Sequence, residues 1–128
     1  MTVELFEKET IQFKLGSEQV EVYFRRPNAG EMVRYLARSL SGKSTESLEP
    51  LLDAGIDLAS ACILGVKEGD IVLIDSGCRT TLATDPSRPD YVSNWKEQLR
   101  DKLPGLLLML GNHLVKLTRS ELEVREKN

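Results

Sequence analysis

Two short segments with alternating apolar and polar residues, joined by a turn and ended by a proline, constrain this chain most. An alternation with period two is typical of strands that bury one face. The apolar positions are Ile11, Phe13 and Leu15 in the first segment and Val20, Val22 and Phe24 in the second. Residues 16–18 form the turn, and Pro27 ends the second strand because its nitrogen has no proton to donate. The sequence therefore predicts an antiparallel hairpin.

A helix is expected directly after the hairpin. Asn28 and Glu31 have the spacing of a capping box, in which each side chain accepts a hydrogen bond from the other residue's backbone N–H. Apolar residues then recur at spacings of three and four, which predicts an amphipathic helix from about Ala29 to Leu40. These residues are Met32, Val33, Leu36, Ala37 and Leu40.

A second helix is expected to begin at an N-cap, Ser47, with Pro50 in its first turn. Its predicted buried stripe is Leu48, Leu52, Ile56, Ala59 and Ile63. Gly55 lies on the flank of this stripe and would let another element approach closely. Residues 71–74, Ile-Val-Leu-Ile, are predicted to form either a short third strand or a hydrophobic plug.

The remainder is expected to contain a loop, two helices and a tail. Residues 75–89 are predicted to form a long loop, and Ser87 to cap a third helix that runs to Lys102. The final helix follows residues 103–105, Leu-Pro-Gly, with a seam at Leu103, Leu107, Leu110, Leu114 and Leu117. Residues 119–128 form a charged tail that is expected to fray. We therefore expect one α+β domain over 1–128, an N-terminal hairpin packed on about four helices.

Composition excludes several classes of function. The chain has 128 residues and a net charge of −3, without the basic stripe of a nucleic-acid-binding protein. Its longest apolar run is far too short to span a bilayer, so a soluble protein of the cytoplasm is expected, with neither nucleic acid nor membrane as partner. Cys62 and Cys78 lack metal-ligand spacing and are expected to be two free thiols, with a disulfide or metal site as the alternative.

Residues suited to catalysis are few. His113 is the only histidine and is expected on a helix surface. Asp53 and Asp57 lie four apart, but such spacing is common on solvated faces. Gly42-Lys43-Ser44 lacks the preceding glycine of a phosphate-binding loop. No catalytic, cofactor-binding or metal-binding residue is therefore predicted, and no cofactor is expected.

The last helix carries more apolar residues than one seam requires. Leu106, Leu108 and Met109 lie off the seam, and Met109 points nearly opposite to Leu107 at about 100° per residue. Either the predicted third helix or the hairpin covers this surplus within the monomer, or a neighbouring molecule covers it. We take the three residues as candidate protein-binding residues, with the methionine suited to an adaptable contact.

The order of these elements resembles the tail assembly chaperones of long-tailed bacteriophages. The resemblance rests on the strand that ends with residues 22–27, Val-Tyr-Phe-Arg-Arg-Pro, the capped helix that follows, and residues 102–105, Lys-Leu-Pro-Gly, before a closing helix. It implies a non-enzymatic protein of the host cell cytoplasm. Such a protein self-associates and coats the long helical tape measure protein during tail assembly. The family offers no residue-level binding motif to carry over.

Two other functions stay open from the sequence. One is a small adaptor or regulatory protein-binding module of a bacterial complex. The other is a degenerate enzyme domain with a substrate pocket beneath the predicted loop. An apolar pocket ringed by Asp75, Arg79 and His113 would favour the enzyme.

Overall fold

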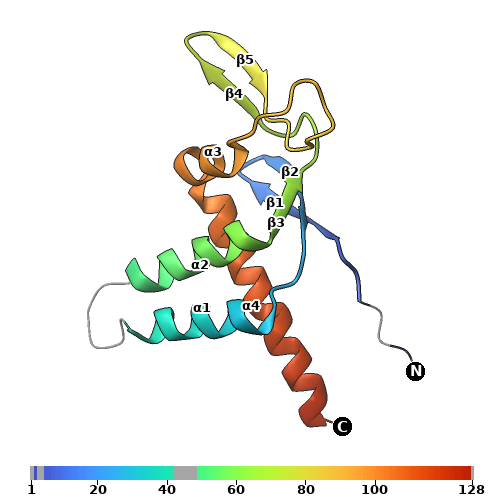
Figure 1. Ribbon diagram of the computed structural model, residues 1–128, viewed down its shortest axis with the longest axis vertical. Helices are drawn as coiled ribbons and strands as arrows, with labels where there is room; N and C mark the ends of the chain where they lie inside the picture. The colour runs from blue at the N-terminus through green and yellow to red at the C-terminus, as the bar shows by residue number, and fades with distance from the viewer. Residues whose placement is uncertain (1, 3–4, 42–48, 128) are drawn as a thin grey trace.

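The computed structural model describes residues 2, 5–41 and 49–127, with side chains for 2, 5–40 and 49–120. Within these residues the fold is α+β, as predicted (Figure 1). The elements are β1 (Glu9–Leu15), β2 (Glu18–Phe24), α1 (Ala29–Ser41), α2 (Glu49–Cys62), β3 (Ile63–Val66), β4 (Val72–Asp75), β5 (Cys78–Thr81), α3 (Trp95–Lys102) and α4 (Pro104–Lys127). The described strands form two sheets, β1-β2-β3 and β4-β5.

The predicted N-terminal hairpin is confirmed. β1 and β2 pair antiparallel from Glu9↔Phe24 to Leu15↔Glu18. Gly16 has φ 64°, a left-handed conformation that glycine adopts without a steric cost. The alternate residues Val20, Val22 and Phe24 of β2 are buried, and those of β1 pack against the same core. The side-chain pattern therefore identified the correct inner face of the hairpin.

The predicted capping box at the start of α1 is also present. The Asn28 backbone N–H donates to Glu31 Oε1 at 2.9 Å, and the Glu31 backbone N–H donates to Asn28 Oδ1 at 2.9 Å. The Arg25 guanidinium donates to both carboxylate oxygens of Glu31, each at 2.8 Å. This ion pair, aided by the Asn28 backbone, lowers the pKa of Glu31 to about 2. The end of β2 and the start of α1 are thus joined by one charged cluster.

Replacing Glu31 by Gln should lower the free energy of unfolding by about 2 kcal/mol at pH 7. Glutamine preserves the capping box but removes the charge that Arg25 binds. Because the folded-state pKa lies below the usual value, this stability is present above about pH 4.5 and is lost as the pH falls toward 2. Denaturant unfolding at pH 7 and pH 3 should show a smaller difference between the wild type and Glu31→Gln at pH 3. Equal differences at both pH values would contradict the ion pair.

The second helix ends earlier than predicted, and a strand follows it. Ile63, placed in the helix by the sequence analysis, instead begins β3, which pairs antiparallel with β2. The last helical residue, Cys62, accepts a hydrogen bond from the Arg25 backbone N–H at 2.9 Å. β2 has one edge that β1 does not occupy, and the β-branched residues Ile63 and Val66 lie on the strand that pairs with it. This pairing is more favourable than one further turn of α2.

The face of α2 that enters the core overlaps the predicted stripe only in part. Ala59 is buried and Ile56 packs against the core, as predicted, whereas Leu52 is 45% exposed. The other buried residues of the helix are Ala54, Leu58 and Cys62. The predicted residues Ser47 and Leu48 lie outside the described residues. Small residues occupy this face because α4 crosses it closely. A Cβ on Gly111 of α4 would lie 2.5 Å from the Gly55 carbonyl oxygen. Close approach at Gly55, predicted from the sequence, is therefore confirmed.

Residues 71–81 form a second hairpin rather than a strand followed by a long loop. The strand predicted at 71–74 is β4, and its partner β5 lies inside the predicted loop 75–89. The turn between them has positive φ at Ser76 (50°) and Gly77 (83°), as a two-residue hairpin turn of this hand requires. The loop prediction failed because the short polar strand Cys-Arg-Thr-Thr has no alternating apolar face.

Two further boundaries differ from the predictions. α3 begins at Trp95 and not directly after Ser87. Ser87 lies in a turn, where its backbone N–H donates to Asp85 Oδ1 at 3.0 Å, and further turns follow before Trp95. α4 begins at Pro104, inside the Leu-Pro-Gly segment that was predicted to precede it, and remains helical to Lys127. The segment 119–127, where the charged tail was predicted, therefore lies in the same helix, and Asn128 lies outside the described residues. The second half of α4 extends beyond the rest of the fold (Figure 1).

Candidate protein-binding surface

The apolar face of α1 points to solvent. Val33 is 64% exposed, Leu36 50% and Leu40 62%, at positions i, i+3 and i+7 of the helix. Ala37, between them, is exposed as well. We call these four residues the α1 stripe. An amphipathic helix ordinarily directs such a stripe toward the core, so its exposure indicates a surface that another molecule covers.

The geometry of α1 explains this exposure. Its other side faces α2, and the cavity between them is lined by Arg34, Tyr35 and Arg38 of α1. Met32 reaches α4, where its sulfur accepts a hydrogen bond from the Thr118 hydroxyl at 3.9 Å. At about 100° per residue the α1 stripe lies nearly opposite the side that faces α2. In Figure 1, no other described element runs along that open side of α1.

A second apolar surface is a groove between the first part of α2 and the middle of α4. Its volume is about 350 Å³. We call it the α2–α4 groove, and its lining residues are Tyr35, Leu51, Leu52, Gly55, Leu108, Met109, Gly111 and Asn112. None of these carries a charge. Because Tyr35 of α1 also lines it, the groove adjoins the side of α1 that faces α2, nearly opposite the α1 stripe.

Two of the three candidate residues on α4 line this groove. Leu108 and Met109 are partly exposed there. Leu106, in contrast, is 0% exposed and belongs to the core, so it cannot contact a partner. Of the two alternatives for the apolar surplus, the same chain covers Leu106, while Leu108 and Met109 stay accessible. Leu106 faces inward because α4 packs against both α2 and α3.

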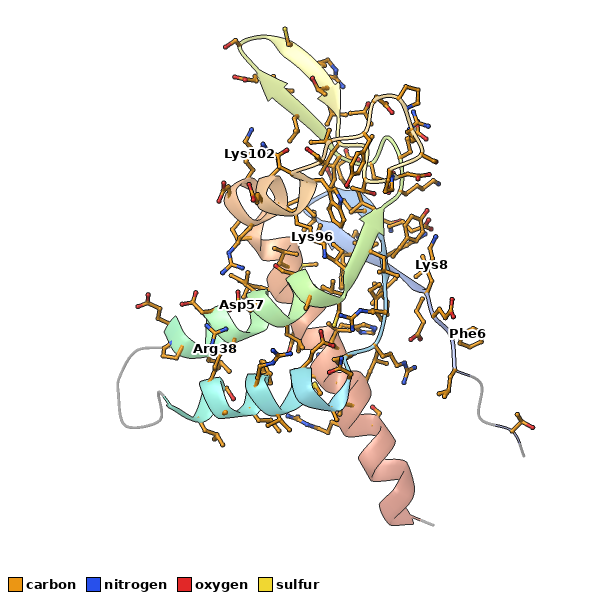
Figure 2. All side chains as sticks on the ribbon, in the orientation of Figure 1. Phe6, Lys8, Arg38, Asp57, Lys96 and Lys102 are labelled. Atoms are coloured by element: carbon orange, nitrogen blue, oxygen red, sulfur yellow. The ribbon has the colours of Figure 1, made fainter. Side chains whose placement is uncertain are left out.

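Charged residues fix the position of α1 and α2 beside this surface. Asp57 of α2 accepts hydrogen bonds from Arg38 of α1 and, at 2.7 Å, from Arg100 of α3 (Figure 2). Burial raises the pKa of Asp57, but these two arginines outweigh it, and the net shift is downward. Asp57 therefore joins three helices rather than forming a carboxylate pair with Asp53.

The residues considered for an enzyme site do not come together. His113, expected on a helix surface, is half-buried and lies edge-on to Phe24, with ring centroids 5.6 Å apart. Burial lowers its pKa. Asp75 and Arg79 lie on the exposed β4–β5 hairpin, away from the sheet that His113 contacts. The pocket that would have favoured an enzyme is therefore not formed by these three residues.

Both cysteines are free thiols, as predicted. Cys62 is fully buried at the end of α2, and burial raises the pKa of its thiol to about 11. Cys78 is exposed on β5. Within residues 2, 5–41 and 49–127, no group of three or more His, Cys, Asp or Glu side chains could hold a metal ion. No helix in this part of the chain has both the length and the apolar content to cross a bilayer.

Comparison with known protein families, with curated proteins and with solved structures finds no match to this chain. The surface itself must therefore carry any inference about function. The sequence analysis missed the α1 stripe as a binding surface, although a signal was present. Met32 and Tyr35 form a second apolar row beside Val33, Leu36 and Leu40, and a helix with two apolar rows predicts two partners.

Proposed function

We propose that this protein is a non-enzymatic assembly factor that binds a helical segment of another protein through the α1 stripe. The observation that carries the proposal is the exposure of Val33, Leu36 and Leu40 on one face of an ordered, capped helix. Scattered apolar residues are normal on a protein surface, but a continuous row over two turns is not. α1 packs against α2, and its Met32 contacts Thr118 of α4, so the helix presents the row without further ordering.

The shape and charge of the stripe favour a helix as its occupant. From Val33 to Leu40 the row spans seven residues, about 10 Å along the axis. A partner helix with apolar residues at i, i+3 or i+4, and i+7 would pack against such a row along its ridges. Arg34, one residue after Val33, is exposed beside the row. An acidic residue on the flank of the partner helix would complement it.

The resemblance to phage tail assembly chaperones supports one identity for this partner. A tape measure protein is long and helical, and would offer many apolar rows of the required spacing. We therefore propose that the protein coats the tape measure protein in the host cell cytoplasm and associates with further copies of itself. Neither nucleic acid nor a membrane is a partner in this proposal.

The test is binding of peptides that tile a tape measure protein, the long helical protein that the proposal expects to be encoded beside this gene. Fluorescence anisotropy should identify at least one segment that binds the wild-type protein. Val33→Glu and Leu36→Glu should each weaken its binding by at least about tenfold, because a charge replaces an apolar contact at the centre of the interface. The matched control is Leu64→Glu, since Leu64 is 42% exposed on β3, away from α1.

Circular dichroism should show that all three variants fold. If no segment binds, or if Leu64→Glu weakens binding as much as Leu36→Glu, the proposal is wrong. If the stripe instead binds a peptide from a two-component or secretion system encoded nearby, the adaptor function replaces the chaperone function. Either result leaves the structural description of α1 unchanged.

A further inference from the structure

We infer that Leu5 and Phe6 of one copy of this protein dock into the α2–α4 groove of a second copy. The inference deepens the proposed function, because self-association is part of it. It concerns the groove and not the α1 stripe, so each can be tested without the other. It also identifies what Leu108 and Met109, the two candidate residues that stay accessible on α4, would contact.

The segment before β1 is an exposed apolar arm. Leu5 is 89% exposed and Phe6 62%, the first being the largest exposed fraction among the large apolar residues described. The arm precedes the first ladder pair, Glu9↔Phe24, and so has no strand partner in the described sheets. In Figure 2, Phe6 lies apart from the body of the molecule. Two adjacent large apolar residues in this position require an explanation.

The α2–α4 groove has the properties of a receptor for such a side chain. It is concave, and its lining contains no charged residue. Leu51 and Leu52 on its rim are 42% and 45% exposed, so part of its apolar surface is open to an incoming group. Asn112 and Tyr35 supply polar groups that can pair with the backbone of an extended segment. The α1 stripe, a convex row on one helix, suits a helix better than it suits an arm.

The arm of one molecule cannot fill the groove of the same molecule. Two interactions anchor its base: Lys8 Nζ lies 4.2 Å from the centre of the Tyr23 ring, and Glu9 pairs with Arg26 at 2.7 Å. Phe6 lies only two residues from Lys8, which is a reach of about 7 Å for an extended chain. The arm leaves the sheet on one side of α4, whereas α1 and the first part of α2 extend on the other side (Figure 1).

Because the arm and the groove are different surfaces, each copy can donate its arm to one neighbour and accept the arm of another, which is a heterologous contact. Such a contact repeats from molecule to molecule and gives a ring if it closes or a chain if it does not. This arrangement leaves the α1 stripe of every copy accessible. A row of copies could therefore bind successive segments of one long helical partner, which is how the inference and the proposed function fit together.

The test is sedimentation equilibrium of the full chain from about 5 to 500 µM. The wild type should show a mass that rises with concentration. Phe6→Glu places a charge on the arm, and Leu52→Glu places a charge on the rim of the groove. Each variant should weaken association by at least about tenfold. Ile74→Glu is the matched control, because Ile74 is 65% exposed on β4 and belongs to neither surface. Met109→Glu serves as a second groove variant.

Mixing the two defective variants gives the sharpest result. Phe6→Glu retains an intact groove and Leu52→Glu retains an intact arm, so an equimolar mixture should form a heterodimer and nothing larger. A wild type that stays monomeric at 500 µM, a mixture that does not associate, or an Ile74→Glu variant that loses association would overturn the inference. Peptide binding to the α1 stripe, measured separately on the monomeric variants, is expected to persist.

Discussion

Replacing Phe24 by alanine is expected to lower the free energy of unfolding by about 3 kcal/mol or more. The ring is 2% exposed on the inner face of β2 and lies edge-on to His113 of α4. Its removal would leave a cavity where the sheet meets the longest helix. Neither neighbour could collapse into this space without breaking the β2 ladder or the helix crossing, so the cavity would remain and add to the cost.

Tyr23 provides the matched control on the opposite face of the same strand. Its ring lies beneath Lys8 Nζ and its hydroxyl donates to Glu21 at 3.0 Å, but neither contact belongs to the core. Tyr23→Ala should therefore cost about 1 kcal/mol. Urea unfolding followed by circular dichroism compares the two variants. Equal losses would show that the inner face of the hairpin is assigned incorrectly.

Replacing Gly111 by valine should also cost about 3 kcal/mol. A Cβ at this position would lie 2.5 Å from the Gly55 carbonyl oxygen and 3.3 Å from Gly55 Cα. Both are backbone atoms of α2, so the two helices would have to separate. Even Gly111→Ala should destabilise the protein, although alanine favours a helix by about 1 kcal/mol over glycine. Thermal unfolding of both variants would measure the effect.

The partner glycine provides an informative control. A Cβ on Gly55 would meet nothing within 4 Å, although Gly55 stands at the same crossing. Gly55→Ala should therefore be neutral or stabilise the protein by up to about 1 kcal/mol. Only the direction of the missing Cβ distinguishes the two positions. If Gly55→Ala destabilised the protein as much as Gly111→Ala, the crossing geometry described here would be wrong.

Local patterns were sufficient to predict the elements whose partners lie close in sequence. The hairpin follows from alternation at residues 11–24, and the start of α1 from the spacing of Asn28 and Glu31. β3 could not be predicted in this way, because Ile63 continues a helical pattern and becomes a strand only where the edge of β2 receives it. Long-range pairing thus outweighed local periodicity.

The candidate surface shows a similar limit. Periodicity indicated that α1 has an apolar row and that α4 has apolar residues beyond its seam. It could not indicate which of them remain exposed, because that depends on where helices cross. The contact between Gly55 and Gly111 places α2 over α4, buries Leu106 and leaves Leu108 and Met109 at the edge of a groove. The same packing places α2 against α1 on the side opposite Val33 and Leu40.

The most direct test of the central claim is a nuclear magnetic resonance titration of the isotope-labelled protein with the tightest-binding partner peptide. The proposed function predicts that backbone amide signals of Val33, Leu36 and Leu40 shift most, with a smaller change beside them at Arg34. Signals of the β4–β5 hairpin should not move. Shifts confined to that hairpin or to the outer face of β1 and β2, with the α1 signals unchanged, would contradict the claim that α1 is the binding surface.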